Sequence, residues 1–483
     1  MSTQPKKPWT VLVYMVADHE GGGIVLDPFA DRELRAIIEA ASLTDMHVAV
    51  QVDFKKRLGT FRGTVVPVAS IDDDAVSSNG SLTGKVKVLS RLIERENGLK
   101  LVGRKQNAAG PKLLVGPEQN AADPIVLREF VQWAQEACPA ERYAIFFWGH
   151  SFGPMGLFLD KRPGSHTVLR AAPLGGVAQA IGSLKQRADV LLFKDCFMST
   201  LETAFEMQDV ARFVIGSQSV IPIRGEWPYT DLFAMLQTAR DGNERLVARA
   251  LAARLGSYYD DRHNRDRFGE VPMSLLDLDA IQAITPLLKT FVEYVLGLKP
   301  DAVVERASRL FERARAGRSV FDLRHPGDPA LLDFAALLQN FALRNVSSEL
   351  TKISVELAGL LGQFVPWSHS QGNTFHGVSI YYTSLNLRVV EKLSVVSALV
   401  LANSSGYGKL ALNRETNWDS VAIETVGSAS LPKQRSQQER TMSKSIKTRT
   451  FGFKIKPDVM KKATARLKRI VRNKQRTSSR RGN

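Results

Sequence analysis

The first half of the chain alternates short apolar runs with segments whose apolar residues recur at helical spacing. The apolar runs predict strands at residues 9–17, 46–52, 143–148 and 190–193. The helical patterns lie between them, at residues 31–41, 124–137 and 176–185. Strands that alternate with helices predict an α/β fold, in which a parallel or mixed sheet carries helices on both faces.

The second half of the chain is richer in helical periodicity. Helices are expected at residues 244–255, 279–295 and 348–361, and one strand at 377–383. We therefore predict a first domain at residues 1–230 and a helix-rich subdomain at 231–430 that packs on it. Residues 100–109 are echoed by 112–122, a duplication too short for a repeat fold, which predicts a flap inserted at 100–123.

The net charge of +16 is concentrated at the C-terminus. Residues 431–483 hold 18 Lys and Arg against two acidic residues, whereas the rest of the chain holds 47 of each kind. We predict a basic, largely disordered tail that could bind nucleic acid or an acidic partner through its charges. A solvated tail without a specific partner is the alternative.

Several classes of protein are excluded by composition. Two cysteines, Cys138 and Cys196, give neither a disulfide framework nor a cysteine-based zinc site. No apolar run approaches the roughly 18 residues of a membrane-spanning helix, and the N-terminus lacks a signal-peptide pattern, which predicts a cytoplasmic protein. The acidic run at 72–74 is interpreted as a solvated turn, so no metal ligand is assigned.

Two of the predicted strands end in reactive residues. His150 follows the run at 143–148, and Cys196 follows the run at 190–193. Sites in open α/β sheets lie beyond the carboxyl ends of the strands, and about 40 residues suffice for one crossover helix between parallel neighbours. Cys196 is therefore a candidate nucleophile with His150 as its acid–base partner, and the backbone N–H groups of Ser151 and Cys196 are candidate oxyanion donors. A buried structural cysteine is the alternative.

Other residues have a structural and a functional interpretation. Asp18 and His19 follow the first strand at the correct end, where they could line a cleft or orient His150. Trp227 and Tyr229 could line a substrate groove or pack in the core. His376 precedes its strand and is interpreted as structural.

An ordered series of segments resembles the clostripain family of cysteine peptidases. It comprises residues 9–17 (WTVLVYMVA), 50–53, 143–150, 193–206 (FKDCFMSTLETAFE), 217–229 and, more loosely, 273–277 and 376–382. The resemblance implies a caspase-like three-layer α/β sandwich with a mostly parallel sheet. It also implies endopeptidase activity on protein or peptide substrates, through a thioester at Cys196 with His150 as partner. No cofactor is expected to be required, and a dependence on calcium is suggested by the resemblance alone.

The sequence departs from that family in the expected substrate pocket. Lys194 stands two residues before the nucleophile, where relatives usually carry Asp, and Asp195 is displaced by one. Arg224 stands near another position that is usually acidic or small, and Ser151 replaces the usual Gly after the histidine. We therefore expect a pocket that prefers Asp, Glu or neutral side chains to Arg and Lys. A catalytically inactive binding or signalling module, recruited by the basic tail, is the alternative function.

Overall fold

The computed structural model describes most of the chain outside a long insertion and the C-terminal tail. The described residues are 6–18, 20–21, 24–54, 59–65, 114–115, 119–161, 169–239, 243–299, 301–314, 331–370, 375–382 and 407–421. The predicted tail at 431–483 and most of the predicted flap at 100–123 lie outside them. In the described part of the chain, no helix has the length and apolar character needed to cross a membrane.

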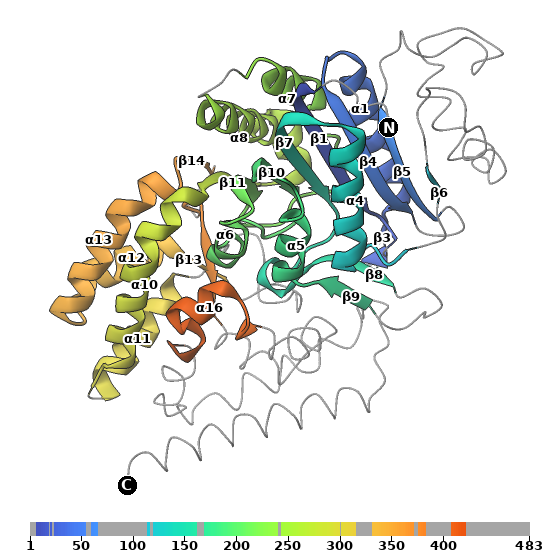
Figure 1. Ribbon diagram of the computed structural model, residues 1–483. Coiled ribbons are helices and arrows are strands. Elements are labelled where there is room, and N and C mark those ends of the chain that lie inside the picture. Colours follow the sequence, from blue (N-terminus) through green and yellow to red (C-terminus); the bar gives the residue numbers. More distant parts are fainter. Residues whose placement is uncertain are drawn as a thin grey trace, which may run out of the picture.

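A central sheet organises the molecule (Figure 1). Within the described residues it has nine strands in the order β14-β12-β11-β10-β7-β1-β4-β5-β6. The five central strands run parallel, and the strands at both edges are antiparallel. The strands are β1 (Lys7–Val16), β4 (His47–Phe54), β5 (Gly59–Val65), β6 (Leu114–Val115), β7 (Ala140–Trp148), β10 (Ala188–Lys194), β11 (Ala211–Ser217), β12 (Met273–Asp277) and β14 (Trp367–His369).

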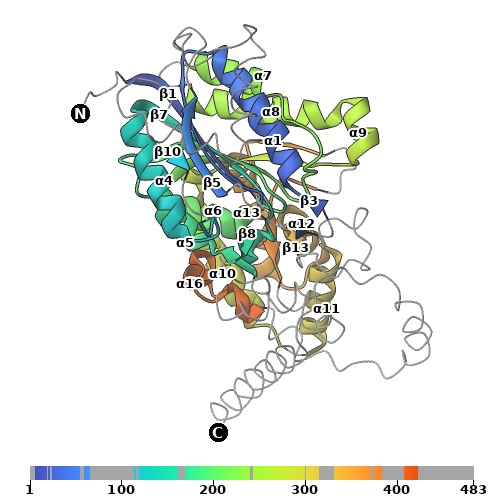
Figure 2. The same ribbon diagram turned by 90° about the vertical axis from the view of Figure 1, so that its right-hand side faces the viewer.

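Helices cover both faces of this sheet (Figure 2). One face packs against α1 (Asp27–Ser42), α7 (Tyr229–Gln237) and α8 (Glu244–Asp260), which is followed by the exposed α9 (Arg262–Phe268). The other face packs against α4 (Pro124–Ala137), α5 (Leu174–Ile181) and α6 (Leu201–Met207). The apolar cluster on this face continues into a group of further helices: α10 (Ile281–Leu296), α11 (Asp301–Arg313), α12 (Phe334–Arg344), α13 (Ser348–Phe364) and α16 (Ala411–Thr416). The two faces bury separate apolar clusters, as expected for a three-layer α/β sandwich.

The predicted C-terminal subdomain is tied to the first sheet. Its strands β12 and β14 extend that sheet, so the predicted boundary at residue 230 divides elements of one sheet. A separate pair, β13 (Leu331–Asp333) and β15 (Ser379–Tyr381), lies against the start of α6 through a bridge between Thr200 and Ser379. Two short antiparallel pairs complete the described strands: β2 (Glu20–Gly21) with β3 (Ile24–Val25), and β8 (Leu157–Lys161) with β9 (Leu169–Ala172).

Local signals explain where several helices begin and end. Asp123 caps α4 by accepting the Ile125 N–H, and Pro124 fills the first helical position. Ser347 caps α13 in the same way through the Leu350 N–H. The helix predicted at 176–185 spans Leu174–Ile181, so it both begins and ends earlier than predicted.

Candidate active site

The ends of β7 and β10 bring the two predicted catalytic residues to one edge of the sheet. These strands are parallel neighbours, and Trp148 is in register with Lys194. His150 lies two residues after Trp148, and Cys196 lies two residues after Lys194. Because these strands are parallel neighbours, His150 and Cys196 both follow carboxyl ends at the same edge of the sheet.

A tight loop holds His150. Its carbonyl accepts the Phe158 N–H at 2.8 Å, and Phe152 N–H donates to the Gly156 carbonyl at 3.0 Å, so the chain turns back within eight residues. The His150 residue is partly exposed, but its Nε2 is buried. Burial lowers the pKa of His150 to about 4, because the imidazolium loses hydration. The imidazole is therefore neutral near pH 7, the form that accepts a proton.

A sharp turn presents Cys196. Phe197 has a positive φ of 59°, and its N–H donates to the Ser219 carbonyl at 3.0 Å, which turns the chain immediately after the cysteine. Thr200 then begins α6 by accepting the Thr203 N–H. The Cys196 residue is partly exposed, and its Sγ lies 3.8 Å from the Ile221 carbonyl oxygen.

The two loops contact one another directly. Ser151 Oγ lies 3.0 Å from the sulfur of Met198 and accepts the Gly153 N–H at 2.9 Å. Its hydroxyl is thus directed at the chain that follows the nucleophile, and the residue is buried. A Cβ on Gly153 would stand 2.9 Å from the Phe197 carbonyl oxygen. The Ser that departs from the family pattern therefore joins the histidine loop to the cysteine loop.

This close approach predicts the effect of adding one methyl group. Gly153→Ala should lower the free energy of unfolding by about 2–4 kcal/mol, from left-handed backbone strain together with the clash against Phe197. Gly359→Ala is the control, because Gly359 lies inside α13 without a positive φ and has nothing within 4 Å of its added Cβ. It should change the free energy of unfolding by less than about 1 kcal/mol. Urea unfolding measures the stability of both variants, and equal losses of stability would contradict the close approach of Gly153 to Phe197.

Lys194 is buried in an ion pair on the α1 face of the sheet. Its ammonium contacts the carboxylate of Glu33, donates to the Gly225 carbonyl at 2.5 Å and lies 5.5 Å from the centre of the Trp227 ring. Both charged side chains are 1% exposed. The positive charge of Lys194, which was expected to repel basic substrates, is therefore compensated by Glu33 within the protein.

Asp195 lies on the opposite face of the sheet. Its Oδ1 would be 3.5 Å from a Cβ built on Gly149, and the residue is completely buried. Burial raises the pKa of Asp195 to about 8, so this carboxyl is mostly protonated at neutral pH. Lys194 and Asp195 thus do not form one pocket in this structure, because their side chains lie on different faces.

The remaining predicted pocket residues differ in exposure. Trp227 and Tyr229 are buried core aromatics: the Trp227 Nε1 donates to Tyr259 at 2.8 Å, and the Tyr229 hydroxyl donates to Glu33 at 2.5 Å. Both side chains therefore pack in the core, which is the structural one of the two interpretations given for them. Arg224 is exposed on the loop that precedes them.

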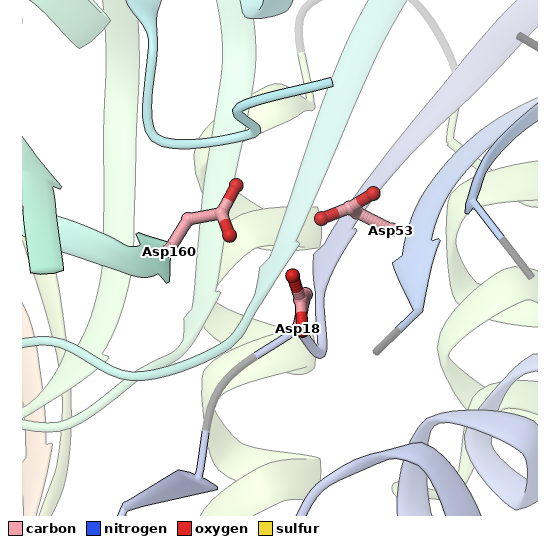
Figure 3. Close-up of side chains that lie close together, drawn as sticks. All are labelled: Asp18, Asp53 and Asp160. Atoms are coloured by element: carbon pink, nitrogen blue, oxygen red, sulfur yellow. The ribbon is translucent and has the colours of Figure 1, made fainter. Parts of the chain in front are cut away.

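Three buried carboxylates meet at the ends of β1 and β4 and on β8 (Figure 3). Asp18, Asp53 and Asp160 are at most 5% exposed, and one oxygen of each lies within 4.8 Å of the others. Asp53 accepts the Thr60 hydroxyl at 2.7 Å, and Asp160 accepts the Ala121 N–H at 2.6 Å. Hard oxygen donors converging from three segments suit Ca²⁺, so this donor set fits the metal that the family resemblance implies. The run at 72–74 lies outside the described residues, as does His19.

His376 and Cys138 take structural positions. His376 Nδ1 lies 3.1 Å from Asp333, whose carboxylate also accepts the His376 N–H at 2.7 Å. Cys138 is buried at the end of α4, and burial raises its pKa to about 12. Its thiol is therefore unreactive at neutral pH.

Sequence reasoning missed Glu33 and Asp160. Glu33 lies within a predicted amphipathic helix, where a lone Glu is normally solvated, and its burial results from contacts with Lys194 and the loop after β11. Asp160 lies on β8, a strand that no apolar run predicted. Neither position carries a local signal in the sequence.

Comparisons with known proteins agree with this architecture. The model of the clostripain family matches residues 13–320. No curated protein matches the chain in sequence. An inactive zymogen C11 protease from Parabacteroides distasonis is similar in structure, with a TM-score of 0.54 at 16% identity over 86% of this chain and 99% of that chain.

Two structures from Bacteroides thetaiotaomicron are also similar. A secreted C11 cysteine protease in complex with an irreversible peptide inhibitor has a TM-score of 0.51 at 16% identity, over 86% of this chain and 98% of that chain. The secreted C11 cysteine protease iotapain has a TM-score of 0.54 at 14% identity, over 86% of this chain and 100% of that chain. These likenesses show a caspase-like α/β fold, and with the family match they establish that the chain belongs to the clostripain family of cysteine peptidases.

Proposed function

We propose that this protein is a cysteine endopeptidase in which Cys196 is the nucleophile and His150 the general acid and base. The observation that carries the proposal is the register of β7 with β10, which sets both residues at matched positions past adjacent strand ends. The similar protease with an irreversible peptide inhibitor supports peptide binding by this fold. The buried, unreactive Cys138 leaves Cys196 as the one candidate thiol.

The proposed reaction uses the neutral imidazole first as a base. His150 takes the proton of the Cys196 thiol, and the thiolate attacks the peptide carbonyl carbon, whose π electrons move to its oxygen. The backbone N–H groups of Ser151 and Cys196 are the proposed donors to that oxyanion. Collapse of the tetrahedral intermediate breaks the C–N bond, and the imidazolium of His150 protonates the departing amine.

Hydrolysis of the thioester restores the enzyme. His150, neutral again, takes a proton from water, and the hydroxide attacks the thioester carbonyl. When the second tetrahedral intermediate collapses, the C–S bond breaks and Cys196 receives the proton from His150 as the acid product leaves. Every proton that His150 takes up in these steps is passed on to the leaving amine or to Cys196, so the residues regain their starting states at the end of the cycle.

Hydrolysis of a peptide-library or casein substrate tests the proposal. The wild-type chain and Cys138→Ala should release new amino termini, whereas Cys196→Ala should release none while showing the same unfolding curve. Equal hydrolysis by Cys196→Ala would overturn the assignment. Absence of hydrolysis and of thiol labelling in a folded wild-type protein would instead favour the inactive binding module.

The burial of His150 predicts the acid limit of activity. Its base form is present above a pKa of about 4 and is lost as pH falls through that value. The acid limb of kcat/KM should therefore lie near pH 4, whereas an unperturbed imidazole would place it near 6.5. A pH profile measured on the free enzyme checks this, and half-maximal activity near pH 6.5 would contradict the buried, neutral histidine.

We propose Asp18, Asp53 and Asp160 as the residues that would hold calcium. A bound Ca²⁺ would supply charge neutralisation there and tie the ends of β1 and β4 to β8, without taking part in the chemistry at Cys196. At calcium about 100 times its Kd, the folded state should gain about 2.7 kcal/mol.

Thermal unfolding with and without calcium measures that gain. Asp160→Asn should abolish the calcium-dependent rise in Tm, and Asp266→Asn, at an exposed position on α9, should retain it. A rise of the same size in all three proteins would place calcium elsewhere, and no rise in the wild type would leave the three carboxylates without a metal role.

The location of the protein and the partner of its tail stay predictions. Both the expected cytoplasmic location and the binding of nucleic acid or an acidic partner rest on sequence features alone. Deletion of residues 431–483, followed by a salt titration of DNA and RNA binding, tests the second.

A further inference from the structure

One buried amide links the loop beside Cys196 to a segment from the second half of the chain. Gln218 directly follows β11 and is 2% exposed. Its Nε2 donates to the Ser379 hydroxyl at 2.8 Å and to the Asp333 carboxylate at 3.1 Å, and its Oε1 accepts the Gly377 N–H at 2.5 Å. Both donors and the acceptor of the amide are therefore in use, which fixes its orientation.

The backbone on either side of Gln218 holds the turn that follows the nucleophile. The Ser219 carbonyl accepts the Phe197 N–H at 3.0 Å. The Ser217 carbonyl accepts the Ser199 N–H, also at 3.0 Å. A change in the backbone at residue 218 would therefore shift two hydrogen bonds that hold this turn in place.

The same loop and the same turn have two further connections. The loop continues to Ile221, whose carbonyl oxygen lies 3.8 Å from the Cys196 sulfur. On the other side, the Ser379 N–H donates to the Ser199 carbonyl at 2.9 Å, and the Ser199 hydroxyl donates to the Gly377 carbonyl at 2.6 Å. The loop, the turn and the segment at 376–379 thus form one hydrogen-bonded unit around the nucleophile.

Asp333 provides a fixed partner for the amide of Gln218. Its carboxylate also accepts the Ala336 N–H at 2.9 Å and the His376 N–H at 2.7 Å, and the residue is 1% exposed. Two backbone donors therefore hold the carboxylate in place. The residues that anchor Gln218 all lie beyond residue 320, where the match to the family model ends.

We propose that Gln218 is a positioning residue for Cys196, because its amide fixes the loop at 217–221 and, through that loop, the place of the thiol relative to His150. The inference rests on the proposed peptidase function. It extends that function to the segment at 376–379, which supports the nucleophile without touching the substrate. Misplacement of a reacting group by about 1 Å costs about 100-fold in rate, so a fixed loop matters to the chemistry as well as to the fold.

Replacement of Gln218 with methionine tests the proposal. Methionine has a similar length and forms none of the three hydrogen bonds, so the loop loses its anchor without a large cavity. In Gln218→Met, kcat should fall by about tenfold or more while KM stays within about twofold of the wild type, because the thiol is misplaced. Alkylation of Cys196 by iodoacetamide, a reagent too small to need the substrate groove, should slow by a similar factor.

Gln51→Met is the matched control. Gln51 is 1% exposed, and its Oε1 accepts the Arg62 Nε–H at 2.8 Å on β5. It lies on β4, three places from β10 in the sheet. This variant should lose stability but keep the wild-type kcat and alkylation rate. A merely structural role predicts the same result for Gln218→Met, so an unchanged kcat in that folded variant would overturn the proposal.

A second variant decides the question if Gln218→Met fails to fold. Ser379→Ala removes one partner of the amide and keeps the backbone, and it should lower kcat by about threefold or more at an unchanged KM. Ser354→Ala, the same change at a buried serine of α13, should leave kcat unchanged. If Gln218→Met is unfolded and Ser379→Ala retains the wild-type kcat, the positioning role is wrong.

Failure of this inference is distinguishable from failure of the proposed function. A wild type that cleaves peptides, beside a folded Gln218→Met that cleaves them equally fast, would overturn the positioning role and leave the peptidase intact. A rise in KM alone would also overturn it, because the loop would then act on substrate binding. Absence of cleavage by the folded wild type would overturn the two proposals together.

Discussion

Replacing His150 with alanine should lower kcat by about 10²–10⁴-fold, because the positioned base and the proton donor to the leaving amine are both lost. The register of β7 with β10 is the reason to expect so large an effect from one side chain. The fold should survive, since His150 lies in a loop fixed by backbone bonds from Phe158 and Phe152. Steady-state kinetics on a peptide substrate, beside an unfolding curve, provides the measurement.

A second histidine provides the control for that substitution. His263 is exposed on α9, and His263→Ala should change kcat by less than about twofold, as expected of a surface position away from the site. A His150→Ala enzyme that retains more than about a tenth of the wild-type kcat would contradict the assigned role.

Breaking the Lys194–Glu33 pair should have the largest effect on stability. Lys194→Met leaves Glu33 buried without its cation, and Glu33→Gln leaves Lys194 buried without its anion. Removing one partner of a buried pair typically costs about 3–5 kcal/mol, because the remaining charge has lost both water and counter-charge. The double variant Lys194→Met with Glu33→Gln should recover much of that loss, since an uncharged pair of similar volume carries no such penalty.

Urea unfolding of the two single variants and the double variant measures this coupling as a double-mutant cycle. The exposed Arg32–Glu226 pair is the matched control, and breaking it with Glu226→Gln should cost about 0–1 kcal/mol. The two side chains would not be coupled if the stability loss of the double variant equalled the sum of the losses of the single variants. The same conclusion would follow if each single variant lost no more stability than Glu226→Gln.

The central fold and the two reactive positions follow from local sequence patterns. The apolar runs that form β1, β4, β7 and β10 are buried over nearly their whole length. Strands that are covered on both faces consist of nearly continuous apolar residues, so the runs alone were enough to predict these strands. The strands' ends are marked by His150 and by Cys196. The predicted helices at α4, α8, α10 and α13 were confirmed: α4 has the predicted bounds, and the other three are shifted by a few residues at one or both ends.

Tertiary contacts decide what the sequence could not predict. Glu33 belongs to an amphipathic helix whose polar residues are normally solvated, and its burial depends on Lys194, which lies 161 residues away. The Trp227 and Tyr229 side chains could line a groove or fill the core, and only the packing against α1 and α8 places them in the core. Asp18 was recognised at a strand end, but its partner Asp160 lies on β8, whose run of three apolar residues is too short to predict a strand.

The reactivity of the two thiols tests the central claim most directly. Cys138 is buried with its pKa raised to about 12, so it serves as an internal reference for Cys196. After exposure to an electrophilic peptide with an uncharged residue at the reactive end, intact-mass measurement and peptide mapping should show a single adduct, on Cys196. Labelling in His150→Ala should be slower by at least about tenfold, because the thiol loses the base that ionises it. A folded wild type that stays unlabelled, or whose labelling rate is unchanged in His150→Ala, would contradict the account.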